Sequence, residues 1–243
     1  MRGKIARFSL FRLDHQSGYR SMITANFIQR TFRIKCGESV GTGFTIDVDG
    51  RQYLVTAKHV VQGFTPVVGI EVFGNNMWTP VASTLVAHGG KDIDVSVLAP
   101  AVAMSPPNLP AIASSGGVAY GQDVYFLGFP FGVLSNVLLG DAGHPLPLVK
   151  KALMSSFAGN VYLLDGHNNP GFSGGPVVFG ANGAVPTRIA AVISGYRNSP
   201  EPVYLDQAAT VLTYRQNTGI VIAYKIELAL EMIAANPIGA AVA

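Results

Sequence analysis

The most restrictive feature of the sequence is residues 169–176, where two prolines and three glycines surround one serine. This high content of proline and glycine favours a tight turn with dihedral angles that other residues rarely adopt. Such a turn can direct the N–H groups of Gly171 and Ser173 into one small cavity beside the Ser173 hydroxyl. Acyl transfer requires this pairing of a nucleophile with donors for the oxyanion that it creates. The alternative is a glycine-rich hairpin loop whose serine is incidental.

The order of the histidines along the chain limits the kind of hydrolase that this turn can serve. Residues 171–175 also fit the G-x-S-x-G pattern of lipases and esterases, a fold in which the catalytic histidine follows the serine. All histidines of this chain precede Ser173, namely His15, His59, His88, His144 and His167. The lipase arrangement is therefore excluded, and an order of histidine, aspartate and serine remains.

The composition indicates a packed protein built from strands. The 243 residues are enough for one large or two small domains, and 49% of them are hydrophobic while only 13% are charged. Glycine and proline are frequent and the apolar runs are short, which favours many strands joined by turns. We therefore expect an all-β fold.

The single cysteine, Cys36, excludes an intrachain disulfide. It lies in a strand-like run, residues 32–36, where a small buried residue is a better interpretation than a catalytic thiol. The Cys and His spacing fits no zinc site, so we expect neither a metal nor a cofactor.

The net charge of +3 is uneven along the chain. Residues 1–51 carry nine Lys or Arg and four Asp or Glu, whereas the remainder carries eight and ten. The basic residues lack clustered aromatics and any nucleic-acid motif, so we expect a solvated face and no nucleic-acid partner. Arg12 and Asp14 interrupt any signal-peptide core, and no apolar stretch reaches membrane-spanning length. We expect a cytoplasmic protein without a membrane partner.

Regular strand signals begin after residue 25 and lead to His59. Residues 27–36, 41–48 and 52–57 are strand-like, and Asp49-Gly50 is a strong hairpin turn between the second and third. His59 follows the third strand directly, where a short helical turn is expected. A core histidine bonded to backbone groups is the alternative interpretation of His59.

An aspartate stands at the start of the next apolar strand. Alternation over residues 92–98 places Ile93, Val95 and Val97 on one face and leaves the aspartates on the other. A carboxylate there is costly unless a buried donor pairs with it, and a histidine N–H is such a donor. We favour Asp94 for this role, because Asp92 fits an exposed turn better.

The second half of the chain repeats the strand pattern after a proline-rich stretch. Residues 106–110 contain three prolines and indicate a connector between two halves. Strand-like segments then follow at residues 123–128, 158–164, 176–179, 188–194, 203–208 and 219–224. A helix-prone segment, residues 226–235, comes last.

Three segments together resemble chymotrypsin-like serine peptidases, and in particular the bacterial HtrA-type branch. Residues 56–61 resemble the histidine segment of that family, residues 94–98 its aspartate segment, and residues 169–176 its serine segment. Supporting similarities occur at residues 41–44, 128–132 and 217–220. Each motif alone is weakly specific, but all six occur in the family's order.

The resemblance implies two six-stranded antiparallel Greek-key β-barrels with the active site between them. The implied division is an N-terminal extension (1–25), a first barrel with His59 and Asp94 (26–105), a connector (106–112), a second barrel with Ser173 (113–225), and a C-terminal helix and tail (226–243).

The resemblance also implies the roles of the site residues. Ser173 would attack the scissile carbonyl, His59 would transfer the proton, and Asp94 would orient the imidazole. The N–H groups of Gly171 and Ser173 would hold the oxyanion. The strand Ser194-Gly195-Tyr196 would pair with the backbone of a protein or peptide substrate.

The sequence departs from trypsin at two places and from the HtrA type at a third. Phe172 stands where trypsin has the aspartate that pairs with a freed N-terminus, so that activation route is not expected. His167 lies near the base of the implied specificity pocket without an acidic residue, which favours small or medium apolar residues at the cleavage site over Arg or Lys. The sequence after Tyr224 is too short for a PDZ domain.

The leading hypothesis is a serine endopeptidase. One alternative is a catalytically silent or latent peptidase fold that binds peptides, and another is an intracellular esterase that uses the same three residues. The sequence does not indicate an oligomeric state.

Overall fold

The structure is a computed structural model, and it describes residues 23–63, 69–133, 145–180 and 186–242. Its first sheet follows the order β5-β4-β1-β2-β3-β7-β6, with a short strand, β15, added beside β3. The strands are β1 (Thr31–Cys36), β2 (Ser39–Val48), β3 (Arg51–Thr56), β4 (Ile70–Gly74), β5 (Met77–Val81), β6 (Ser83–His88), β7 (Ser96–Pro100) and β15 (Ala240–Ala241).

The second sheet closes on itself. Strand β12 pairs with both β9 and β13, so that six strands form the ring β12-β9-β10-β11-β14-β13. Strand β8 is not part of the ring and pairs in parallel with the start of β13. The strands are β8 (Ile112–Ala113), β9 (Asp123–Gly128), β10 (Leu148–Ala158), β11 (Val161–Asp165), β12 (Pro176–Phe179), β13 (Arg188–Leu205) and β14 (Ala208–Lys225).

The expected all-β chain with two antiparallel barrel-type sheets is confirmed. Six of the seven strands of the second sheet form the ring expected of a barrel, whereas the first sheet is a path of seven strands, joined at β3 by β15, with no closing pair among the described residues. The Asp49-Gly50 turn joins β2 to β3 as expected, with both residues at positive φ (49° and 71°). Cys36 is buried, as expected for a small strand residue.

Four predicted segments were wrong in their bounds. The strand expected over residues 27–36 begins with a short helix, α1 (Ala25–Gln29), whose buried Phe27 accepts the Thr31 hydroxyl at its carbonyl. The strand expected over residues 158–164 is interrupted by a turn at Gly159, where β10 ends and β11 follows. The strand expected over residues 188–194 continues as β13 to Leu205, and the segment expected over residues 203–208 contains the end of β13, a turn at residues 206–207 and the first residue of β14.

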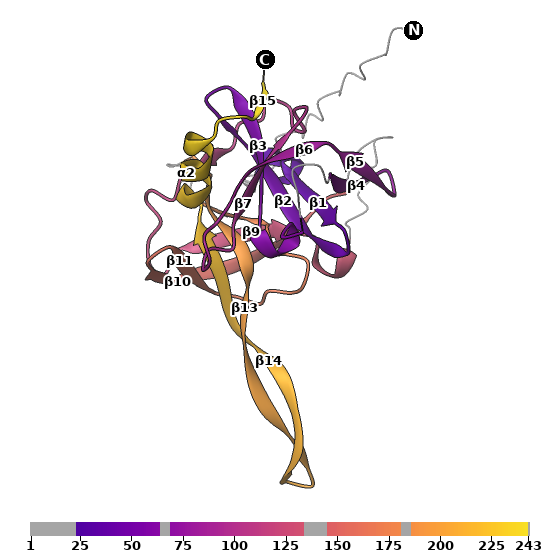
Figure 1. Cartoon of the computed structure of the whole chain (residues 1–243). Coiled ribbons are helices and arrows are strands. Elements are labelled where there is room, and N and C mark those ends of the chain that lie inside the picture. Colours follow the sequence, from indigo (N-terminus) through magenta and orange to yellow (C-terminus); the bar gives the residue numbers. More distant parts are fainter. Residues whose placement is uncertain (1–22, 64–68, 134–144, 181–185, 243) are drawn as a thin grey trace, which may run out of the picture.

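Strands β13 and β14 extend beyond the ring as a two-stranded arm (Figure 1). The arm, residues 197–217, is paired from Asn198–Asn217 near its base to Leu205–Ala208 at its tip. Asp206 and Gln207 make the turn with positive φ angles of 47° and 67°. Two prolines interrupt the strand pattern in the sequence of the arm, so the pattern did not predict the arm. The prolines are tolerated because the edges of the arm are free.

The two sheets share one apolar core. Phe44 and Tyr53 of the first sheet pack in the same cluster as Leu127 and Val192 of the second. The C-terminal helix expected from the sequence is α2 (Glu227–Ala235), which adds the buried residues Ala229 and Ile233 to this cluster beside β6 and β7. The chain end then returns to β3 through β15.

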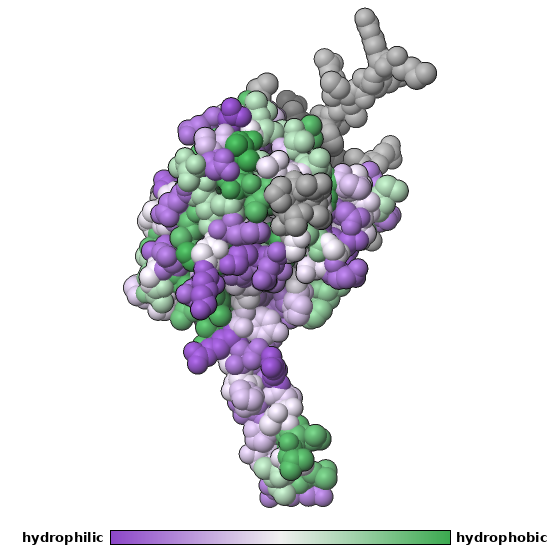
Figure 2. Space-filling view, in the orientation of Figure 1, coloured by the Kyte–Doolittle hydropathy of each residue, from purple (hydrophilic) through white to green (hydrophobic). Residues whose placement is uncertain are grey.

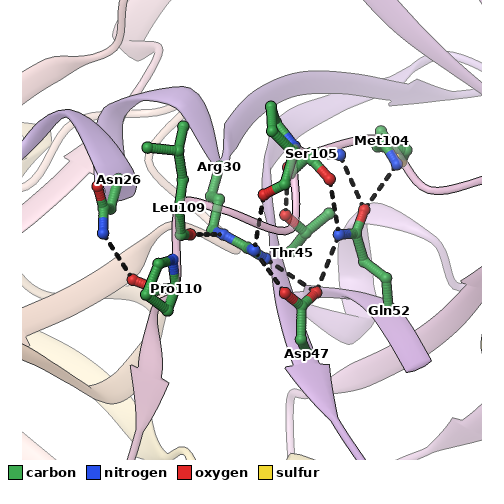
Figure 3. A network of polar contacts seen from close by, with 10 residues as sticks. Asn26, Arg30, Thr45, Asp47, Gln52, Met104, Ser105, Leu109 and Pro110 are labelled. Atoms are coloured by element: carbon green, nitrogen blue, oxygen red, sulfur yellow. Dashed lines mark hydrogen bonds and ion pairs between the residues drawn. The ribbon is translucent and has the colours of Figure 1, made fainter. Parts of the chain in front are cut away.

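A polar network fixes the proline-rich connector to the first sheet (Figure 3). Arg30, only 1% exposed, forms two hydrogen bonds with Asp47 and donates to the carbonyls of Leu109 (2.6 Å) and Pro106 (3.2 Å). Gln52 accepts the N–H groups of residues 104 and 105 at 2.6 and 2.8 Å. The domain boundaries at residues 26, 106, 113 and 226 stay a prediction, and most of the extension 1–25 lies outside the described residues.

Candidate active site

His59 lies in a one-turn 3-10 helix, η1 (Lys58–Val60), directly after β3. Val60 and Val61 are buried beneath this turn and anchor it to the apolar core of the first sheet. The side chain of His59 points outward and is about half exposed (49%). A β-branched pair next to the histidine therefore determines which side of the turn faces solvent.

Asp94 lies between β6 and β7 with both carboxylate oxygens at His59. Oδ1 accepts the backbone N–H of His59 at 2.9 Å, and Oδ2 lies 2.7 Å from Nδ1 of its ring. The Ser194 hydroxyl donates to the same Oδ2 at 2.6 Å. For Asp92 the only recorded contact within the described ranges is at its carbonyl, which accepts the Tyr224 hydroxyl at 2.8 Å. The structure thus brings Asp94, and not Asp92, to the histidine.

The surroundings of Asp94 keep its carboxyl group ionised. Burial raises its pKa, but hydrogen bonds from the His59 ring, from the Ser194 hydroxyl and from the His59 N–H outweigh burial, so the pKa of Asp94 lies below its usual range. An ionised carboxylate only accepts, so the ring proton of His59 must lie on Nδ1. In the neutral imidazole, Nε2 of His59 is then left as an acceptor.

The backbone of the serine turn is bonded to both sheets. The carbonyl of Ser173 accepts the N–H of Thr42 at 2.8 Å, and the N–H of Gly174 donates to the carbonyl of Ile193 at 2.7 Å. Gly174 has φ +85°, and a Cβ there would lie 2.0 Å from the Thr42 carbonyl oxygen. The glycine after the serine is therefore required by the approach of the first sheet to the second.

Ser194 connects the aspartate to the serine. Its hydroxyl bonds Asp94, while its carbonyl accepts the Ser173 hydroxyl at 2.9 Å. The pairing of β13 with β14 shifts register between Ile193 and Gly195, so Ser194 lies at a bulge that frees it for these contacts. The sequence analysis predicted Ser194 only for substrate binding and missed this connecting position, which depends on a bulge without a sequence signature.

Gly41 brings the histidine turn and the serine turn together. A Cβ on Gly41 would lie 2.7 Å from a Val60 methyl group and 2.9 Å from the Ser173 carbonyl oxygen. The neighbour of His59 and the backbone of Ser173 thus contact one glycine. No hydrogen bond between the His59 ring and the Ser173 hydroxyl is recorded within the described ranges, and that hydroxyl donates to the Ser194 carbonyl.

Gly171 has a conformation that only glycine supports. Its φ is +106°, and a Cβ would lie 2.4 Å from the Phe129 carbonyl oxygen. The carbonyl of Pro170 accepts the N–H of Phe131 at 2.9 Å, and the carbonyl of Gly171 accepts the Thr42 hydroxyl at 2.7 Å. For the part of the chain that the structure describes, no acceptor is recorded for the N–H of Gly171 or of Ser173. Two donors beside the Ser173 hydroxyl are thus free to receive a negatively charged oxygen.

The edge of β13 next to the serine turn is open. Strand β12 pairs with β13 only as far as Val192, and within the described ranges no further strand covers Ser194, Gly195 and Tyr196 on that edge. These three residues are partly exposed. An extended peptide can add to such an edge through backbone hydrogen bonds.

His167 lies at the surface beside a lysine that the sequence analysis missed. The His167 side chain is exposed, and its carbonyl accepts the ammonium of Lys150 at 2.6 Å. The same ammonium donates to Oδ1 of Asn169 at 2.7 Å, and burial lowers the pKa of Lys150. The strand that carries Lys150, β10, was not predicted over residues 148–157, so its alternating pattern was not used.

The described residues contain no group of three or more His, Cys, Asp or Glu side chains arranged to hold a metal ion. Among the helices described, none combines the length and the apolar character needed to cross a bilayer. His15 and His144 lie outside the described residues.

Comparison with known proteins identifies one family and several similar folds. The family model of the trypsin-like peptidase domain matches residues 41–185. No curated protein matches the sequence. Among solved structures, an inactive form of the Rv3671c protease of M. tuberculosis is 20% identical, with 87% of this chain and 91% of that chain covered and a TM-score of 0.53.

Two further solved structures are proteases of similar fold. The HtrA-type protease AlgW with a tripeptide is 21% identical, with 89% of this chain and 63% of that chain covered and a TM-score of 0.57. A serine endoprotease from Yersinia pestis is 19% identical, with 86% and 63% covered and a TM-score of 0.56. At these identities the three structures establish the fold that the chain shares with them.

Proposed function

We propose that this chain, a member of the trypsin-like peptidase family, is a serine endopeptidase whose catalytic residues are Ser173, His59 and Asp94. One observation carries this proposal: the hydrogen-bonded series from the His59 ring to Asp94, from Asp94 to Ser194, and from Ser194 to the Ser173 hydroxyl. The series joins the two sheets, as a site between two barrels requires.

In the proposed reaction the Ser173 hydroxyl exchanges its bond to the Ser194 carbonyl for one to Nε2 of His59. His59 accepts the proton as Ser173 attacks the scissile carbonyl, and then donates it to the leaving amine. Water, activated by the same imidazole, hydrolyses the acyl-enzyme. Asp94 keeps the ring proton on Nδ1 throughout and stabilises the imidazolium that forms.

The N–H groups of Gly171 and Ser173 are proposed to hold the oxyanion. Support comes from the lack of a recorded acceptor for either group within the described ranges and from the Phe131 N–H, which binds the Pro170 carbonyl. Because the carbonyl and N–H of a trans peptide point in opposite directions, that bond directs the Gly171 N–H away from Phe131.

The proposed substrate is an extended peptide segment of a protein. The open edge of β13 at Ser194, Gly195 and Tyr196 offers backbone groups for an added strand, and the related protease AlgW was solved with a tripeptide. Residues near His167 would receive the side chain before the cleaved bond.

Cleavage of a proteome-derived peptide library, read by mass spectrometry, tests this function. The wild type should generate new peptide ends that share a preference at the cleaved bond, and Ser173→Ala should generate none. Equal cleavage by both proteins would show that the activity does not come from Ser173.

One observation favours a second candidate, a latent peptidase fold that binds peptides. The Ser173 hydroxyl donates to the Ser194 carbonyl instead of the imidazole, as expected of a resting site. This candidate predicts measurable binding of library peptides by the wild type without cleavage, and no reaction of Ser173 with an organofluorophosphonate. Cleavage by the purified chain would exclude it.

A further inference from the structure

We propose that Lys150 is a positioning residue that holds residues 167–172 in the shape that directs the Gly171 and Ser173 N–H groups at the oxyanion; this role rests on the proposed function. The Lys150 ammonium donates to the His167 carbonyl at 2.6 Å and to Oδ1 of Asn169 at 2.7 Å. It also lies 5.7 Å from the ring centroid of Phe172, the residue before the nucleophile.

The position of Lys150 on β10 places it behind the serine turn. Lys150 pairs directly with Phe126 of β9, and directly paired residues share one face of a sheet. Phe126 is fully buried and contacts Phe172 edge to face, with ring centroids 4.9 Å apart. The Lys150 side chain therefore leaves β10 on the inward face of the ring, and its ammonium reaches the serine turn where the bond to the His167 carbonyl is still exposed to solvent.

The turn has few other anchors before Gly171. Asn168 is buried, and its carbonyl accepts the side-chain amide of Asn217 at 2.7 Å. Its own side chain accepts the N–H of Asn169 at 2.8 Å. On either side of Asn168, the carbonyl of His167 and the side chain of Asn169 are bonded by Lys150. Removal of the ammonium would release both and leave residues 167–170 held only by the bonds at Asn168 and by the bond from the Phe131 N–H to the Pro170 carbonyl, as far as the described residues show.

The charge of Lys150 is not neutralised by a carboxylate. Within the described ranges no Asp or Glu is recorded at ion-pair distance from it, whereas the adjacent Lys151 pairs with Asp123 at 2.8 Å on the opposite face of the strand. The contacts recorded for the Lys150 ammonium are hydrogen bonds to neutral oxygens and the nearby ring of Phe172. Trypsin has an aspartate at the position of Phe172, and this turn has no such carboxylate there. Lys151 provides a matched control.

Kinetics of Lys150→Met, Lys150→Arg and Lys151→Met test the role. Loss of one oxyanion donor costs about 10²–10³-fold in kcat, so a loosened turn in Lys150→Met should lower kcat by roughly 10–100-fold, with KM changed by less than about threefold. Lys150→Arg should recover part of kcat, and Lys151→Met should match the wild type. Unfolding temperatures of all four proteins separate this effect from a loss of fold.

A second measurement is independent of activity. In amide NMR spectra of the protein labelled with ¹⁵N-glycine, the Gly171 signal should shift or broaden in Lys150→Met and stay in place in Lys151→Met. An unmoved Gly171 signal, or an unchanged kcat, would overturn the role of Lys150. If the wild type cleaves no peptide but the Gly171 signal moves, the proposed function fails while the positioning by Lys150 stands.

A separate observation concerns the arm formed by β13 and β14. Of the 17 large hydrophobic side chains exposed among the described residues, six lie near its tip: Val203, Tyr204, Leu205, Val211, Leu212 and Tyr214. Figure 2 shows the apolar surface gathered at the end of the arm, beyond a more polar shaft. A two-stranded ribbon without further strands is marginally stable in water, so a partner that covers the apolar tip would stabilise this arm.

We infer that the tip of the arm binds a second copy of this chain. Neighbouring residues of a strand point to opposite faces, so the six residues give apolar surface on both faces of the tip, and a second copy that covers them would approach the ~800 Å² that each partner contributes to a stable interface. Both edges of the ribbon are free in the arm, and an identical edge can pair with it about a two-fold axis. The arm contains two basic and two acidic residues, a balance that gives no attraction to an anionic lipid surface.

Sedimentation equilibrium tests whether the tip of the arm binds a second copy of the chain. The wild type should be dimeric at about 10 μM, and Leu205→Asp with Leu212→Asp should be monomeric, with the same circular dichroism from the sheets. Val102→Asp is the matched control, because Val102 is 67% exposed and Leu205 is 69% exposed. A wild type that stays monomeric at ~100 μM, or a double variant that still dimerises, would contradict the inference.

Discussion

Replacement of Asp94 by asparagine should nearly abolish turnover, because the geometry favours the orientation of the new amide that gives His59 the wrong tautomer. If the NH₂ group occupies the place of Oδ2, it faces Nδ1 of His59 and the Ser194 hydroxyl, which bond that oxygen at 2.7 and 2.6 Å. The ring proton then moves to Nε2, and His59 cannot accept a proton from Ser173.

In the opposite orientation the NH₂ group faces the backbone N–H of His59, which donates to Oδ1 at 2.9 Å. The new NH₂ group and the His59 N–H are both donors, so the hydrogen bond between them is lost at a cost of about 1–3 kcal/mol. The first orientation is therefore favoured, and with it the wrong tautomer. A wrong tautomer lowers kcat by about 10⁴-fold, which is ~5.4 kcal/mol of transition-state stabilisation.

The assay is kcat for a peptide identified in the library experiment, with Asp92→Asn as the control. The Asp92 side chain has no recorded contact with His59 within the described ranges, so Asp92→Asn should retain wild-type turnover. The reasoning is refuted if Asp92→Asn loses turnover and Asp94→Asn keeps it.

Three further predictions concern the fold and its response to pH. Gly174→Ala should fail to fold or lose reaction at Ser173, because its Cβ would lie 2.0 Å from the Thr42 carbonyl oxygen; solubility and circular dichroism check this. Arg30→Met should lower the free energy of unfolding by about 3–5 kcal/mol in urea, because Asp47 and two connector carbonyls lose their cation; Arg51→Met, at an exposed position, should change it little. The pKa of the Asp94 carboxyl group is lower in the folded chain than in the unfolded chain, where it is about 3.9. Ionisation of Asp94 therefore stabilises the fold above the unfolded pKa, and this stabilisation is lost as the pH falls through the folded pKa. The stability difference between wild type and Asp94→Asn should therefore shrink below about pH 4.

The sequence predicted the parts of the fold that depend on local pattern. Alternation and turn residues located β2, β3, β9 and β12, and the order of motifs located three side chains that the structure brings to one hydrogen-bonded group. Asp94 was separable from Asp92 because a carboxylate at the start of a buried strand needs a donor. The catalytic roles of these residues stay a prediction.

What the sequence did not predict depends on contacts between distant segments. Ser194 joins Asp94 to Ser173 only because β13 bulges beside it, and Lys150 reaches the serine turn only because β10 and β9 pair in one register. The arm was missed because Pro200 and Pro202 interrupt the strand pattern where the ribbon has no neighbours. In each case tertiary pairing decided the outcome.

Reaction of the purified chain with an organofluorophosphonate, followed by peptide mapping, tests the central claim most directly. The account predicts one adduct, on Ser173, with no adduct on Ser173→Ala and a strongly slowed reaction in His59→Ala. An adduct on a different residue, or equal rates in wild type and His59→Ala, would contradict it.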